Sequence, residues 1–149
     1  MISNLKKLIG SGFLSGYLPK APGTFGSFIA LLIYFIPGFE NPIIIISSIL
    51  FSILIGIPLG NYFEEIYGKD PGKFTLDEFI GTWISLLFIP KNIIIIFFSF
   101  ILWRFLDIIK PFPANKAENL SGGLGIILDD VISGMYSLII IHIFIVIFF

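Results

Sequence analysis

Five carboxylates fall in short polar clusters of a chain that is otherwise strongly apolar. Asp77 and Glu78 are adjacent, Asp129 and Asp130 are adjacent, and Asp107 lies between the two pairs. Neighbouring carboxylates repel each other, so keeping both ionised near a membrane favours a cation beside them. Hard oxygen ligands of this kind suit Mg²⁺, which binds one or two carboxylates together with waters and substrate phosphate. The pattern predicts metal and phosphate chemistry.

Cationic residues and a glycine-rich turn accompany these acids. Arg104, Asp107 and Lys110 follow an i, i+3, i+6 spacing and therefore share part of one helix face. A guanidinium suits phosphate because its planar fork donates two parallel hydrogen bonds. Residues 22–27 read Pro-Gly-Thr-Phe-Gly-Ser, and such a turn at a helix start can present backbone N–H groups to an anion.

Each cluster also has a structural interpretation. Asp77 and Glu78 would cap a helix start for about 0.5–2 kcal/mol, and taken alone this pair favours capping. Gly81, one turn after Asp77, is expected to leave room for a ligand. For Arg104 and Asp107, an i,i+3 ion pair at the membrane interface and a phosphate-binding role explain the spacing equally well. For the last acidic pair, capping is the weaker explanation.

The composition excludes several other chemistries. Cysteine is absent, which removes thiolate metal sites and cysteine nucleophiles. The single histidine, His142, lies among Ile and Phe, so phosphohistidine chemistry is not indicated. The basic residues form no run, which argues against nucleic acid as a partner. The glycine-rich turn lacks the Gly-Lys-Ser/Thr ending of a nucleotide-hydrolysing loop.

Apolar helices must position the clusters. Hydrophobic residues make up 56% of the chain, and charged residues make up 13%, against roughly 25% in soluble domains. Four charge-poor stretches could lie in lipid, at residues 21–39, 41–63, 79–103 and 131–149. The second and the last are long enough to span it, whereas Pro37-Gly38 makes the first one short. Pro90 interrupts the third and predicts a hairpin of two short helices, at 76–89 and 93–109. We predict an all-α membrane bundle of four or five short spans, forming one domain over residues 1–149.

The distribution of charge predicts an orientation. If residues 79–103 form a hairpin, eight of the nine Lys and Arg residues fall on one side and Lys91 falls alone on the other. The positive-inside tendency places the crowded side in the cytosol. Glu40 is the one acidic residue left outside. Gly122–Gly125 is expected to be a turn, so that Asp129 opens the last span.

Taken in order, the motifs resemble the phosphatidylglycerophosphatase A family. The resemblance rests on Pro-Gly-Thr-x-Gly-Ser, Asp-Glu-x-x-Gly, Arg-x-x-Asp-x-x-Lys-Pro-x-Pro, Gly-Gly-x-Gly and Asp-Asp, from about Gly10 to Gly134. It implies a Mg²⁺-dependent membrane phosphatase that removes the terminal phosphate of phosphatidylglycerophosphate to give phosphatidylglycerol. It also implies a multi-pass protein of the bacterial inner membrane whose active site faces the cytosol.

On this resemblance we expect three groups of site residues. The expected catalytic residues are Asp77, Glu78, Asp107 and Asp130. The expected Mg²⁺ ligands are Asp77, Glu78, Asp107, Asp129 and Asp130. The expected phosphate-binding residues are Lys20, Thr24, Ser27, Arg104 and Lys110. Two alternatives stay open: a phosphatase for another lipid phosphomonoester such as phosphatidic acid, and a non-enzymatic ion-binding membrane protein.

Overall fold

The computed structural model describes residues 3–148, and these residues form helices and no strand. The helices are α1 (Asn4–Gly10), η1 (Ser15–Tyr17), α2 (Pro22–Tyr34), α3 (Pro42–Tyr67), α4 (Leu76–Ser85), α5 (Ile93–Ile109), α6 (Ala114–Ala117) and α7 (Gly122–Phe148). This confirms the predicted all-α class. The expected hairpin is present as α4 and α5, although α4 ends at Ser85 rather than at residue 89.

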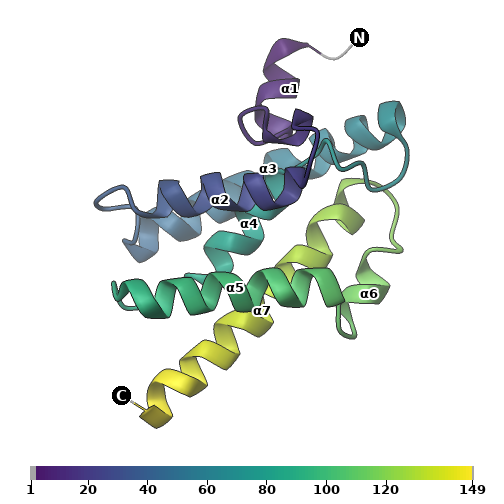
Figure 1. Ribbon diagram of the computed structural model, residues 1–149. Coiled ribbons are helices and arrows are strands. Elements are labelled where there is room, and N and C mark those ends of the chain that lie inside the picture. Colours follow the sequence, from purple (N-terminus) through teal and green to yellow (C-terminus); the bar gives the residue numbers. More distant parts are fainter. Residues whose placement is uncertain (1–2, 149) are drawn as a thin grey trace.

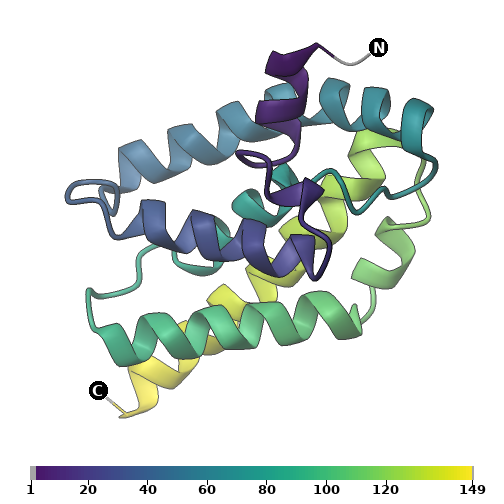
Figure 2. The ribbon, with the colours of Figure 1, turned by 45° about the horizontal axis from the view of Figure 1, so that its top comes forward.

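Helix α4 lies at the centre of the fold. It packs against α2, α3, α5 and α7, and both views show it enclosed by the longer helices (Figures 1 and 2). Most of its side chains are buried, including Phe79, Ile80 and Trp83. Trp103 on α5 is also buried, so both tryptophans contribute to packing rather than to a surface belt. The central position of α4 carries its acidic N-terminus into the middle of the molecule.

Helices α3 and α7 are long and apolar enough to cross a membrane. They contain 26 and 27 residues and therefore extend about 40 Å, against a hydrocarbon core of about 30 Å. In their most apolar windows only 28% and 22% of the residues are buried, so the molecule leaves most of these helices uncovered. Within residues 3–148 these are the two helices of that length and composition. The span count of four or five stays a prediction.

The last helix begins earlier than the sequence predicts. Gly122–Gly125 is the first turn of α7 and not a connecting loop, so Asp129 lies about two turns inside the helix. The side chain of Asn61 on α3 accepts a hydrogen bond from the Gly123 N–H at 2.7 Å and caps α7 from outside. A Cβ on Gly123 would meet the Ile57 backbone, so glycine permits this close crossing. The cap and the crossing are tertiary contacts, which a local pattern does not reveal.

Lys91 and Glu40, the two charged residues predicted to lie apart from the rest, form an ion pair. The ammonium of Lys91, in the α4–α5 loop, lies 2.8 Å from the carboxylate of Glu40, in the α2–α3 loop. Both loops lie at one end of the bundle, whereas α6 and the α3–α4 loop lie at the other (Figures 1 and 2).

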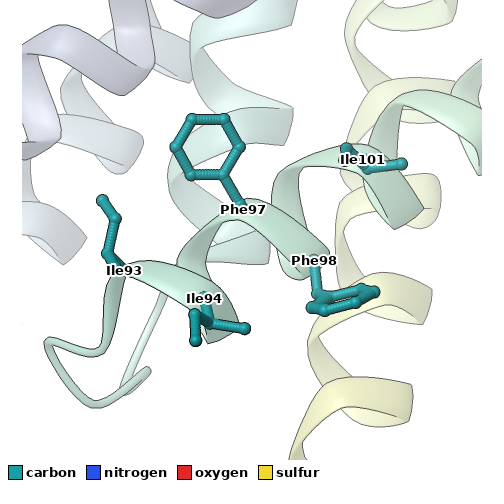
Figure 3. Close-up of a pocket in the computed structure, with 5 residues that line it drawn as sticks. All are labelled: Ile93, Ile94, Phe97, Phe98 and Ile101. Atoms are coloured by element: carbon teal, nitrogen blue, oxygen red, sulfur yellow. The ribbon is translucent and has the colours of Figure 1, made fainter.

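The outer face of α5 is continuously apolar. Five exposed side chains form a shallow pocket of about 250 Å³, and Figure 3 shows them spread along the helix: Ile93, Ile94, Phe97, Phe98 and Ile101. An uncovered apolar face of this size suits contact with lipid or another apolar surface.

Candidate active site

Three helices bring the acidic clusters together around one cavity. The start of α4, the end of α5 and the third turn of α7 converge on a space of about 170 Å³. Six acidic side chains line it: Asp70, Asp77, Glu78, Asp107, Asp129 and Asp130. All five carboxylates expected at the site are therefore brought to the same cavity, together with Asp70, which the motif pattern did not indicate.

Three of these carboxylates form a compact oxygen cluster. Asp107, Asp129 and Asp130 each offer one oxygen, and these oxygens lie within 4.8 Å of one another. All three residues are buried, with exposed fractions of 8%, 3% and 4%. Asp129 Oδ1 and Asp130 Oδ2 are buried and have no hydrogen-bond partner. Buried charges need a partner, and this donor set fits a hard divalent cation such as Mg²⁺.

The Arg104 guanidinium bridges two of the acids that line the cavity. Its Nη1 group donates to Asp107 Oδ2 at 2.7 Å and to Glu78 Oε2. The Ser27 hydroxyl lies 2.8 Å from the same Glu78 oxygen, in donor geometry. The predicted ion pair between Arg104 and Asp107 is therefore present, and the hydroxyl of Ser27 is bound to Glu78. Arg104 orders the carboxylates of α4 and α5.

Lys110 joins α5 to α7 on the other side of the cavity. Its ammonium donates to Asp129 Oδ2 at 2.6 Å and lies 2.7 Å from Glu118 Oε2. Burial lowers the pKa of Lys110, but the hydrogen bonds to both carboxylates outweigh it and raise the pKa above its usual value. Lys110 has a left-handed backbone, with φ of 50°, at the end of α5. Non-glycine residues held in this conformation are often found at functional sites.

The cavity has an excess of negative charge. Six acidic side chains against Lys110 and Arg104 give a formal charge of −4 when all are ionised. An empty cavity of this charge would repel a phosphate group.

The glycine-rich turn reaches the cavity through its backbone. Gly23 lines the cavity, and a Cβ there would meet Glu78. Lys20 and Thr24 are exposed and do not line it, so the structure does not bring these two expected phosphate ligands to the acidic cluster. Of the expected phosphate-binding residues, Lys110 lines the cavity and Ser27 and Arg104 lie beside it.

The expectation of free space beside Gly81 is wrong. A Cβ on Gly81 would lie 2.7 Å from the indole Nε1 of Trp103, so the ring already fills the space. The glycine therefore serves the close approach of α4 to α5. This packing holds the start of α4 against the end of α5.

Two acids near the site were missed by the motif pattern. Asp70 lies in the α3–α4 loop, and Glu118 follows α6. Glu118 has no motif signal, since it meets Lys110 only through the tertiary fold. Asp70 opens an Asp-Pro-Gly sequence at 70–72, which is typical of a turn, but nothing local indicates that this turn faces the cavity.

Comparisons with known proteins agree with this geometry. A family model described as phosphatidylglycerophosphatase A matches residues 8–145. A protein of Escherichia coli named phosphatidylglycerophosphatase A is 34% identical over 139 residues, which cover 91% of this chain and 81% of that protein. A protein of the same name from Haemophilus influenzae is 35% identical over 141 residues, covering 90% and 85%.

A third relative carries a different name. It comes from Bacteroides thetaiotaomicron, is provisionally named phosphatidylinositol-3-phosphatase, and is 38% identical over 147 residues, covering 93% of this chain and 92% of the relative. No solved structure matches the chain.

Proposed function

Because the chain belongs to the phosphatidylglycerophosphatase A family, we propose that it hydrolyses phosphatidylglycerophosphate to phosphatidylglycerol and inorganic phosphate with Mg²⁺. Family membership makes the chain a lipid phosphatase, which decides against the non-enzymatic alternative. The substrate and the metal are the proposed parts. The domain would extend over the whole chain.

One observation supports the requirement for a metal ion. The Asp107, Asp129 and Asp130 carboxylates are buried close together, and two of their oxygens lack any partner. These three residues would hold Mg²⁺, which when bound supplies Lewis acidity and offsets charge on the phosphate. The formal charge of −4 around the cavity supports a cation as the precondition for binding an anionic substrate.

The remaining side chains divide between binding and proton transfer. An ammonium has three N–H groups, and Lys110 uses two on Asp129 and Glu118, which leaves one for a phosphate oxygen. Arg104 donates to the carboxylates through Nη1, so its other N–H groups remain for a phosphate oxygen. Asp77 lines the cavity but lies outside the three-carboxylate cluster, so we assign it as the base that takes a proton from the attacking water.

The roles of the other expected residues rest on the same proposal. Glu78 is occupied by Arg104 and Ser27, so it would position these groups at the cavity. Lys20 and Thr24 would contribute to phosphate binding only through movement of the exposed turn toward the cavity.

We place the chain across the bacterial inner membrane, with the cavity at the cytosolic side. Helices α3 and α7 are long enough to cross, and the apolar outer face of α5 favours a lipid environment for the shorter helices as well. That arrangement gives four or five short spans. The Lys91–Glu40 pair, at the opposite end, would face the periplasm.

A second substrate is favoured by one specific observation. The relative from Bacteroides thetaiotaomicron has a name that points to phosphatidylinositol 3-phosphate. Phosphatidic acid is the other lipid phosphomonoester to compare. Both present a phosphomonoester to the same carboxylate-lined cavity.

The test is phosphate release by the detergent-purified protein. The assay compares phosphatidylglycerophosphate, phosphatidylinositol 3-phosphate and phosphatidic acid, each with Mg²⁺ and with EDTA, and uses Asp130→Asn as the inactive control. Release from the first lipid alone, abolished by EDTA, supports the proposal. Equal release from all three broadens the substrate, and release that persists in EDTA contradicts the metal requirement.

A further inference from the structure

Asp70 stands apart from the other acids around the cavity. It lines the cavity from the α3–α4 loop, but it is exposed and lies outside the compact oxygen cluster. Among residues 3–148 its carboxylate has no hydrogen-bond or ion-pair partner. The carboxylate therefore lies at the mouth of the cavity, farther out than the proposed metal ligands.

The loop holds this carboxylate in a defined place. Asp70 has a left-handed backbone with φ of 46°, which is uncommon for a residue other than glycine. On one side, the Lys69 ammonium donates to the Asn119 carbonyl at 3.2 Å. On the other, the Lys73 ammonium lies 4.2 Å from the centre of the Tyr67 ring. Because these contacts hold the loop on both sides of Asp70, its unpaired carboxylate has a defined position at the cavity and is available to a ligand.

The position beyond the metal ligands is where a head group must extend. A phosphate at the cluster of Asp107, Asp129 and Asp130 occupies the base of the cavity, so the carbon atoms that carry it lie toward the mouth. A carboxylate accepts hydrogen bonds and cannot donate them. Near a phosphate it is repulsive unless the substrate offers a donor, so it selects by penalising substrates without one.

We propose that Asp70 accepts a hydrogen bond from a free hydroxyl on the carbon next to the one that bears the phosphate. This inference rests on the proposed phosphatase function and narrows its substrate class. Phosphatidylglycerophosphate and phosphatidylinositol 3-phosphate both carry such a vicinal hydroxyl. In phosphatidic acid the corresponding oxygen is acylated. The head groups in the names of two relatives thus share the feature that Asp70 would recognise.

The test uses two lipids that differ in one hydroxyl. Phosphatidylglycerophosphate is compared with its analogue lacking the hydroxyl next to the phosphate, for the wild type and for Asp70→Gly and Asp70→Asn. Glycine and asparagine both tolerate the left-handed backbone, so neither variant should strain the loop. Glu65→Gln, an exposed acid that does not line the cavity, is the matched charge control.

We expect the wild type to prefer the hydroxylated lipid in kcat/KM by about tenfold to a hundredfold, the range for one hydrogen bond to a charged group. Asp70→Gly should lose this preference, because the hydroxylated lipid loses its hydrogen bond and is hydrolysed more slowly, while the analogue no longer meets an unpaired carboxylate and is hydrolysed faster. Asp70→Asn, which keeps a neutral acceptor, should retain part of it. The Glu65→Gln control should keep the wild-type preference, and Mn²⁺ binding measured by calorimetry should be unchanged in all variants.

Three results would overturn the inference. Equal losses on both lipids would show a general role for Asp70, and weaker Mn²⁺ binding by Asp70→Gly would make it a metal ligand. Equal kcat/KM of the wild type for the two lipids would show that the protein does not recognise the hydroxyl. If the wild type releases phosphate from neither lipid but does so from phosphatidic acid, the proposed substrate fails as well, and that result is separate from any variant.

Discussion

Replacing Asp130 with Asn should stabilise the metal-free protein while abolishing its activity. Asp130 shares a cluster with Asp107 and Asp129 in which the offered oxygens lie within 4.8 Å. Two unit charges at that separation repel by about 3.5 kcal/mol at an effective dielectric constant near 20. Asp130→Asn removes two such pairs, and its amide can donate to the remaining carboxylates.

Protonation limits the size of the effect. A carboxyl group with an ordinary pKa near 3.9 can be protonated at pH 7 at a cost of about 4 kcal/mol, so the repulsion relieved by the substitution cannot exceed that cost. The ammonium of Lys110 already offsets part of the charge on Asp129. We therefore expect a stabilisation of about 2–4 kcal/mol, equivalent to a rise in Tm of roughly 5–10 °C.

Thermal denaturation in detergent can measure both the repulsion in the metal-free protein and the stabilisation by Mg²⁺. In EDTA, Asp130→Asn should unfold at a higher temperature than the wild type. Added Mg²⁺ should raise the Tm of the wild type, because a ligand that binds only the folded state stabilises it, and should leave the variant nearly unchanged. Glu65→Gln removes the same charge from an exposed position and should shift neither value. A variant less stable than the wild type in EDTA would refute the reasoning that these carboxylates repel one another.

Three further outcomes are expected. Lys110→Gln leaves Asp129 without its ammonium partner at 2.6 Å, so phosphate release should fall at least about tenfold; unchanged kcat/KM would exclude Lys110 from the site. Gly81→Ala would drive a methyl group into Trp103, so thermal denaturation should show a loss of about 1–3 kcal/mol; an unchanged Tm would mean that α4 and α5 can separate freely. In a chain without cysteine, a single Lys91→Cys should react with an impermeant maleimide in intact cells, and protection until lysis would reverse the proposed orientation.

The sequence predicted the helices well where local signals were strong. The hairpin of α4 and α5 follows from Pro90, and the Pro37-Gly38 sequence agrees with the end of α2 at Tyr34. The predicted start of the last span at Asp129 is seven residues too late, because Gly122–Gly125 looks like a turn unless the capping side chain of Asn61 is known.

The structure brings the expected acids to one cavity, but it brings only some of the expected cations there. Carboxylates are costly to bury, so their presence between apolar stretches was itself a signal. The same reasoning could not show that Arg104 is committed to Glu78, since these residues meet only when α4 and α5 pack together. Nor could it assign Asp70, whose exposure and loop position look ordinary until the cavity is seen beside it.

The negative charge of the site also accounts for the number of cations placed beside the carboxylates. If the phosphatase depends on a metal, as we propose, it must bind a cation before an anion, so the metal-free site has to remain folded with an excess of negative charge. Lys110 and Arg104 reduce that excess by linking α4, α5 and α7 through ion pairs, while leaving oxygens of Asp129 and Asp130 unpartnered. A third fixed cation would stabilise the empty protein further, but it would compete with the metal for the same oxygens. The site is therefore expected to be the least stable part of the metal-free bundle, and hydrogen exchange at the α4 and α7 amides around it should slow when Mg²⁺ is added.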